Sequence, residues 1–215
     1  MADYKVVDAE QLNADLSSVA DAIRDRAKTT ESMDFPNGFV SSVNNLVDSK
    51  GIFDATIKEV VIPTNVTTLR RGVFYDCISL EKVTFHDGLT AVGGACFFCC
   101  TALKECVLPV GVKTITSQTF FLNYALQKVD CWLTAINGSG VFQECSKLTL
   151  IIRSDTVCTL ESTAAFSSSS ISKGTGYIYV PRALVDSYKS ATNWSTYASQ
   201  FRAIEDYPEI TGGAA

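Results

Sequence analysis

Four of the eight cysteines lie within fourteen residues, in the segment GGACFFCCTALKEC at 93–106. Cysteine thiolates bind metals, form disulfides and act as nucleophiles, so this segment raises three kinds of chemistry. A zinc site needs two cysteine pairs at suitable spacing, and Cys96-x-x-Cys99 supplies at most one of them. The segment alone therefore does not predict a metal site, and its meaning depends on the elements around it.

The rest of the sequence contains little that would support catalysis. His86 is the single histidine, in the turn-like segment FHDGLT, where we expect it to face solvent. A Cys-His or Ser-His centre would have to use it, and the sequence contains no nucleophile elbow, phosphate-binding loop or HExxH motif. The acidic residues form no recurring pair of the glycosidase kind. We expect a protein that is not an enzyme and that uses neither a cofactor nor a metal.

Composition excludes several classes of partner. With 47% apolar residues, 19% charged residues and a net charge of -5, the chain is typical of globular proteins. It contains no dense cluster of lysine and arginine, so nucleic acid is not an expected partner. No segment approaches the roughly 18 consecutive apolar residues of a membrane span, and the N-terminus lacks a signal-peptide pattern. We therefore expect no membrane insertion and reduced thiols.

An internal repeat predicts the fold. The segments VFYDCISLEKV (73–83), CFFCCTALKEC (96–106) and TFFLNYALQKV (119–129) superpose at a period of 23, and VFQECSKLTLI (141–151) follows after one deletion. Three columns of the repeat are apolar or small: Phe74, Phe97, Phe120 and Phe142; Cys77, Cys100, Asn123 and Cys145; Leu80, Leu103, Leu126 and Leu148. A unit this short cannot bury its own apolar face, so neighbouring units must stack.

The same columns explain most of the cysteines as core residues. Cys96 replaces Val73 of the preceding unit, and Cys106 replaces Val83. Free cysteine behaves as a small apolar side chain in such positions. Cys77 and Cys100 would lie on adjacent units, so a disulfide formed on oxidation remains an alternative.

The pattern IPxxVTxIxxxxFxxCxSLxxV resembles the BspA-type leucine-rich repeats over residues 57–166. The resemblance implies an α+β repeat solenoid of about four to five coils of short parallel strands, which we assign to residues 51–166. The segment YIYVPRALVDSYKSATNWSTYASQFRAIED resembles the one that closes such arrays. We therefore assign residues 167–215 to a C-terminal cap, with a last strand at 177–180, a helix from Pro181, and Trp194, Tyr197 and Phe201 covering the final coil.

Residues 1–50 form a separate segment. Leu12, Leu16, Val19 and Ile23 follow the spacing of an amphipathic helix, and FPNGFVSSVNNLV predicts a second helix, so we expect a helical hairpin. Either the hairpin caps the solenoid, or it serves in oligomerisation and attachment. The sequence of this segment resembles the N-terminal segments of tail-associated proteins in phages and prophages of Gram-positive gut bacteria. That resemblance implies a virion protein, made in the host cytoplasm without a signal peptide and bound to other virion proteins through residues 1–50.

Nine residues between the Phe and Leu columns do not fit the core. They are Tyr75, Asp76 and Ile78, then Phe98, Cys99 and Thr101, then Phe121, Leu122 and Tyr124. A contiguous apolar surface rich in aromatic residues is typical of an interaction site. We expect a strip that binds a host cell-surface protein or glycan; alternatively, the hairpin or another subunit covers it.

The residue types in this strip also fit a variable protein. All nine can be encoded by triplets ending in C, an outcome that resembles retroelement-driven diversification. We therefore expect a non-enzymatic binding or adhesion protein of a phage virion, involved in host attachment. The alternatives are a purely structural virion component and a bacterial cell-surface leucine-rich-repeat adhesin.

Overall fold

The computed structural model describes residues 57–212. The chain divides into two compact units, Met1–Asn45 and Leu46–Ala215, and the described residues belong to the second. The expected helical hairpin, including Leu12, Leu16, Val19 and Ile23, lies outside the described residues. Within residues 57–212, no helix is long and apolar enough to span a membrane.

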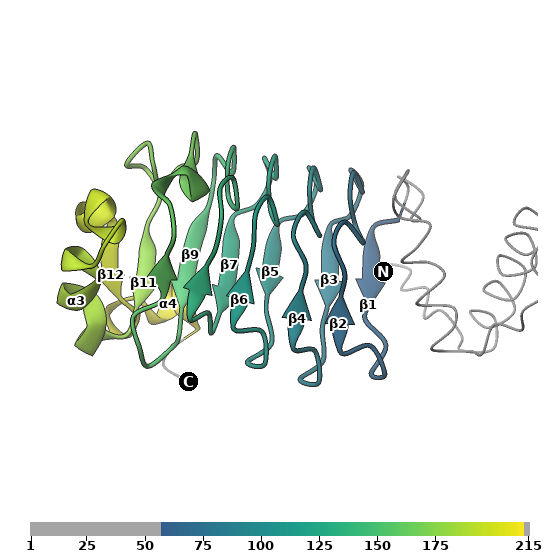
Figure 1. Cartoon of the computed structure of the whole chain (residues 1–215), viewed down its shortest axis with the longest axis horizontal. Coiled ribbons are helices and arrows are strands. Elements are labelled where there is room, and N and C mark those ends of the chain that lie inside the picture. Colours follow the sequence, from purple (N-terminus) through teal and green to yellow (C-terminus); the bar gives the residue numbers. More distant parts are fainter. Residues whose placement is uncertain (1–56, 213–215) are drawn as a thin grey trace, which may run out of the picture. The chain divides into compact units, whose positions relative to one another are not determined.

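The second unit is a stack of coils, each with a longer strand on one side and a two-residue strand on another (Figure 1). The longer strands are β1 (Glu59–Val61), β3 (Lys82–Thr84), β5 (Glu105–Val107), β7 (Lys128–Cys131) and β9 (Thr149–Ile152). The short strands are β2 (Thr68–Leu69), β4 (Ala91–Val92), β6 (Thr114–Ile115), β8 (Ala135–Ile136) and β10 (Thr159–Leu160). These strands make five coils, in agreement with the predicted repeat.

All strand pairs in the described residues are parallel, and their register follows the repeat. Cys106 lies opposite Val129, and Val129 lies opposite Leu150, so equivalent positions of successive coils are neighbours. The longest sheet has the order β12-β11-β9-β7-β5, and the short strands β10-β8-β6 form a second sheet. The prediction of short, stacked, parallel strands is therefore confirmed.

A column of phenylalanine rings runs through the interior. Phe74, Phe97, Phe120, Phe142 and Phe166 are at most 1% exposed. Their ring centroids lie 5.3 to 5.5 Å apart, with interplanar angles of 13° or less. Phe166 belongs to η1 (Thr163–Phe166) and extends the four-residue column that the sequence predicts to a fifth coil. We call these five residues the inner phenylalanine column.

The cysteine column is a set of hydrogen-bond donors as well as core. Cys100 Sγ donates to the Phe74 carbonyl at 3.1 Å, and Cys145 Sγ donates to the Phe120 carbonyl at 3.0 Å. Asn123 fills the same role with its amide, which donates to the Phe97 carbonyl at 2.7 Å. Buried carbonyls need such partners, so the column joins each coil to the one before it. Treating these cysteines as plain apolar residues was therefore incomplete.

All eight cysteines are free thiols. Burial raises the pKa of the Cys145 thiol to about 12 and, helped by Asp76, that of Cys77 to about 11. Thiols of this kind are poor nucleophiles at neutral pH because the thiolate is the reactive form. The cluster at 93–106 is mostly part of the core, since Cys96, Cys100 and Cys106 are at most 2% exposed.

Opposite charges align between coils on the outer face of the longer strands. Lys104 Nζ lies 3.2 Å from a Glu81 carboxylate oxygen, and Lys128 Nζ lies 3.0 Å from Glu105. The hydrogen bond from Lys104 and the charges of Lys104 and Lys58 lower the pKa of Glu81. These pairs are exposed, so they favour the register of neighbouring coils without adding much stability.

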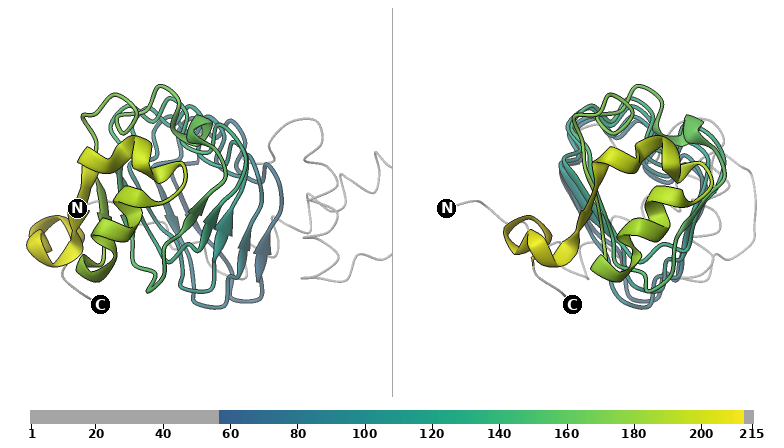
Figure 2. Two further views of the ribbon diagram at one scale, coloured as in Figure 1. Left: turned by 60° about the vertical axis from the view of Figure 1, so that its left-hand side comes forward. Right: turned by 90° about the vertical axis from the view of Figure 1, so that its left-hand side faces the viewer.

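The C-terminal segment closes the stack. β11 (Ile178–Val180) and β12 (Phe201–Ala203) extend the sheet, and η2 (Arg182–Leu184), α3 (Val185–Ser190) and η3 (Trp194–Gln200) connect them. Figure 2 shows α3 and η3 lying across the end of the coils. The chain then continues through η4 (Ile204–Asp206) and α4 (Pro208–Thr211). A strand does lie at Ile178–Val180, where one was expected, but it is not the last, because Phe201 belongs to the further strand β12.

Aromatic residues of the cap end the inner phenylalanine column. The Phe166 ring lies 5.7 Å from Trp194 and 5.3 Å from Tyr197. Trp194 Nε1 donates to the Cys158 carbonyl at 2.6 Å, and the Cys158 N–H donates to the Tyr188 hydroxyl at 2.8 Å. Each buried polar atom of these rings has a partner, so the cap covers the last coil without leaving an unpaired group.

Candidate binding surface

The nine residues of the predicted strip lie in equivalent turns of three consecutive coils. Each turn places one aromatic ring inside and the next one outside: Phe74 is buried while Tyr75 is 42% exposed. The pairs Phe97 and Phe98, and Phe120 and Phe121, alternate in the same way, with the second residue half-buried. The structure thus brings the nine residues together along one edge of the stack.

The outer rings stack on one another. The Tyr75 and Phe98 centroids lie 4.4 Å apart at an interplanar angle of 8°, and those of Phe98 and Phe121 lie 4.9 Å apart at 15°. Backbone bonds fix this spacing, since the Asp76 N–H donates to the Phe98 carbonyl and the Cys99 N–H to the Phe121 carbonyl, both at 2.8 Å. We call Tyr75, Phe98 and Phe121 the outer aromatic row.

Exposed apolar residues flank the row. Ile78 and Tyr124 are each 46% exposed, among the most exposed large apolar residues of the described chain. Between them, the Thr101 hydroxyl donates to the Ile78 carbonyl at 3.2 Å. Thr101 therefore contributes its methyl group and hydroxyl oxygen to the surface, while Ile78 and Tyr124 contribute most of the apolar area.

The next residue of each turn has a left-handed backbone. Asp76, Cys99 and Leu122 have φ values of 61°, 59° and 61°, and Glu144 and Ser168 repeat the conformation in the following coils. A side chain beyond glycine costs roughly 1–2 kcal/mol in this region. Nevertheless, none of the five is glycine, so the turns present side chains where glycine would fit with less strain.

The aromatic row stops at the fourth coil. Gln143 and Ser167 occupy the positions equivalent to Phe121 in the fourth and fifth coils. A Cβ atom on Gly140 would lie 3.4 Å from the Phe121 ring, which shows that the last ring packs against the fourth coil. The apolar surface is therefore a patch of three coils with a polar boundary.

The surface carries no activated nucleophile. Cys99 is half-buried, and burial, together with the hydrogen bond and charge of Asp76, raises the pKa of its thiol. A reactive cysteine requires the opposite shift. Across residues 57–212, no group of three or more His, Cys, Asp or Glu side chains is arranged to hold a metal ion.

His86 has a structural role that its sequence position did not indicate. Its Nε2 lies 3.0 Å from the Val66 carbonyl oxygen, and its Nδ1 lies 3.0 Å from the Gly88 amide nitrogen. The carbonyl can only accept and the amide can only donate, so Nε2 carries the proton and Nδ1 accepts. The expectation of a solvent-facing residue was wrong, because His86 is half-buried and joins two coils.

The comparison with protein families agrees with the repeated coils described above. Residues 49–173 match the BspA type leucine rich repeat region in six copies. A solved structure of a leucine rich repeat protein from T. pallidum (TpLRR) is similar, with 23% sequence identity and a TM-score of 0.48. The match covers 57% of this chain and 57% of that one, so the chain spans little more than half of that protein's length. No curated protein matches the sequence. The family model covers more than half of the 215 residues, and the chain therefore belongs to the BspA type leucine rich repeat family.

Proposed function

We propose that the protein is a non-enzymatic binding protein that contacts a partner through the outer aromatic row, Ile78 and Tyr124. Leucine-rich repeats are suited to protein-protein binding or adhesion. The observation that carries the proposal is the stacked, partly exposed ring system, with Tyr75 42% and Tyr124 46% exposed.

Packing within the coil does not require these rings. Burying apolar area contributes about 25 cal/mol per Å², so half-exposed aromatic and aliphatic side chains leave stabilisation unused. A partner that covers them would recover it, and aromatic residues at the centre of a patch commonly dominate binding energy.

The stacking favours a protein partner over a glycan. Sugars pack their C–H groups on the faces of aromatic rings, where the π electrons are concentrated. In the outer aromatic row Phe98 is stacked on both faces, and Phe121 is stacked on Phe98 and packed against the fourth coil. The edges of the two phenylalanine rings, the exposed tyrosines Tyr75 and Tyr124, and Ile78 are left for contact, and this mixture suits the varied side chains of a protein surface.

For the location of the protein, we propose attachment to a phage virion through residues 1–50, with a host cell-surface protein as the partner. The support is the resemblance of those residues to phage tail-associated proteins. Diversification of the nine-residue strip is part of the same proposal. A bacterial surface adhesin or a structural virion component would use the same solenoid with a different attachment.

Binding to intact cells tests the proposal. Purified protein is labelled and added to a panel of Gram-positive gut bacteria, and a Tyr75→Ala, Phe98→Ala, Tyr124→Ala variant is compared with the parent. We expect at least tenfold weaker binding of the variant. Tyr177→Ala is the matched control, because Tyr177 is 40% exposed but lies outside the strip.

Two further treatments separate the alternatives. Proteinase K on the cells should abolish binding and periodate should not, whereas loss with periodate alone would indicate a glycan. Equal binding by the folded triple variant would exclude the aromatic row as the contact surface. Light scattering on parent and variant tests whether a second copy of the chain covers the strip. A dimer that dissociates in the variant would support the structural alternative.

A further inference from the structure

The repeat is interrupted at one connection between a longer and a short strand. The connection runs seven positions from Val107 to Thr114, five from Asp130 to Ala135 and eight from Ile151 to Thr159, and the strand register makes these positions equivalent. The connection of the fourth coil is therefore shorter than those on both sides. A short loop between two longer loops leaves a recess at this edge of the stack.

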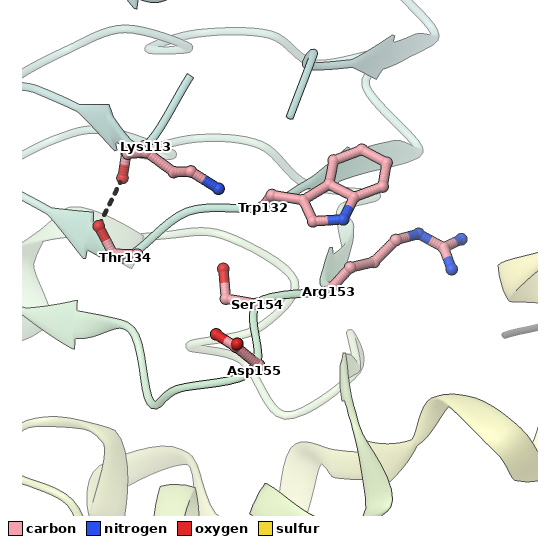
Figure 3. A pocket seen from close by; sticks show the side chains of 6 residues that line it. All are labelled: Lys113, Trp132, Thr134, Arg153, Ser154 and Asp155. Atoms are coloured by element: carbon pink, nitrogen blue, oxygen red, sulfur yellow. Dashed lines mark hydrogen bonds between the residues drawn. The ribbon is translucent and has the colours of Figure 1, made fainter. Parts of the chain in front are cut away.

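A pocket of about 270 Å³ occupies this recess. It is lined by residues of three coils, namely Lys113, Trp132, Thr134, Arg153, Ser154 and Asp155 (Figure 3). Ligand pockets commonly begin near 300 Å³, so this one suits a single ring-sized group and not an extended ligand.

Trp132 occupies a position that holds proline or histidine in the first three coils. The equivalent positions, 23 residues apart, are Pro63, His86 and Pro109. The Arg153 guanidinium carbon lies 5.8 Å from the centroid of the indole ring. In the described part of the chain no other aromatic ring stacks on Trp132, which distinguishes it from the outer aromatic row.

A buried ion pair holds this arrangement in place. Arg153 Nε and Nη2 donate to the two carboxylate oxygens of Asp130 at 2.7 and 2.8 Å. Both side chains are nearly buried, with 10% and 11% exposure. A bidentate pair of this kind fixes the guanidinium plane, so the indole beside it is positioned before any ligand arrives.

The remaining groups offer both hydrogen-bond donors and acceptors. Within residues 57–212, neither the Lys113 ammonium nor the Asp155 carboxylate forms an ion pair, and Figure 3 shows Lys113 extending toward Trp132. The Ser154 hydroxyl donates to the Leu133 carbonyl at 2.7 Å, and that of Thr134 to the Lys113 carbonyl at 3.2 Å. Both hydroxyl oxygens can still accept a hydrogen bond.

We propose that this recess binds one pyranose residue of a glycan. A sugar ring presents C–H groups to an aromatic face and hydroxyl groups that both donate and accept. Trp132 supplies the face, Asp155 accepts from hydroxyl groups, and Lys113 donates to them. This site is separate from the proposed protein-binding strip and does not depend on it.

Tryptophan fluorescence tests the site directly. The chain has two tryptophans, and Trp194 is fully buried under the cap, so a change in emission on ligand addition reports Trp132. Glucose, galactose and N-acetylglucosamine are titrated at millimolar concentrations, the range typical of weak single-residue contacts. We expect a saturable change with at least one sugar and none in Trp132→Phe, whose Trp194 emission shows that the fold is intact.

A matched pair of variants keeps the fluorescent reporter. Asp155→Asn should weaken sugar binding at least tenfold, while Asp87→Asn, on the equivalent connection of the second coil, should leave it unchanged. Both aspartates are exposed, so neither change should affect folding. The proposal is overturned if no sugar gives a saturable change, if open-chain sorbitol gives the same response, or if the two variants behave alike.

Discussion

The inner phenylalanine column and the outer aromatic row are neighbours in sequence and differ in exposure and in extent. Both consist of parallel rings one coil apart, with centroids 5.3 to 5.5 Å apart inside and 4.4 to 4.9 Å apart outside. The inner column continues through five coils and ends on the cap, whereas the outer row ends after three. A large ring fills the inside of all five coils, whereas Gln143 and Ser167 stand at the outer position of the fourth and fifth, so the fold of a coil does not need an outer ring.

Two alanine substitutions at adjacent positions give the largest expected contrast. Phe97→Ala should reduce the free energy of unfolding by about 3–5 kcal/mol, because it leaves a cavity between two stacked rings. Phe98→Ala removes a half-buried ring and should cost about 1 kcal/mol. Urea unfolding of both variants measures the difference. Similar losses would mean that the outer row is structural.

Buried and half-buried cysteines should likewise differ in how they make the free energy of unfolding depend on alkaline pH. Burial raises the pKa of Cys145 from the ordinary value of 9.0 to about 12, so folding favours the protonated thiol. The stabilisation is complete below pH 9, where the unfolded thiol is also protonated, and is lost as the pH rises toward 12. The slope is about 1.4 kcal/mol per pH unit for each such thiol.

Unfolding measured between pH 7 and pH 11 should therefore show a steep loss of stability above pH 9. Cys145→Val should flatten this dependence by the contribution of one thiol. Cys99→Ser, at the half-buried position, should change it less. An equal effect of both substitutions would contradict the assignment of Cys145 to the core and Cys99 to the surface.

A further contrast concerns two leucines four positions apart. Leu126→Ala, in the buried leucine column, should cost about 2–5 kcal/mol. Leu122→Gly removes a half-buried side chain but relieves a left-handed backbone, and these effects should cancel to within about 1 kcal/mol. Thermal and urea unfolding of both variants provide the measurement. A large loss for Leu122→Gly would show that packing holds this side chain in place.

The repeat itself was predictable because residues one period apart in the sequence stack on one another in the structure. A period of 23 residues places Phe74, Phe97 and Phe120 in one column whatever the details of the turns. The same reasoning grouped Tyr75, Phe98 and Phe121, since residues next to a column form a second column. The period could not predict the ring stacking, the left-handed turns or the hydrogen bonds of Cys100 and Cys145, because these depend on loop geometry.

Features outside the regular period were missed for a related reason. The fifth coil places Phe166 after irregular spacing, and Phe201 lies in a strand that follows three helical segments, so neither aligns by period. The recess at Trp132 arises from a shortened connection. The deletion is visible in the sequence, but a recess forms only because the loops on both sides are longer.

The cap at the C-terminal end also bears on whether two molecules can stack end to end. A stack of parallel coils with an uncovered last layer can accept a layer from another molecule, and repetition of that contact produces filaments. In this chain Trp194 and Tyr197 lie where the next phenylalanine of the column would be, so the inner phenylalanine column cannot continue into another molecule at this end. The longest sheet, in contrast, ends in β12, so the cap closes the interior of the stack while leaving β12 as the edge strand.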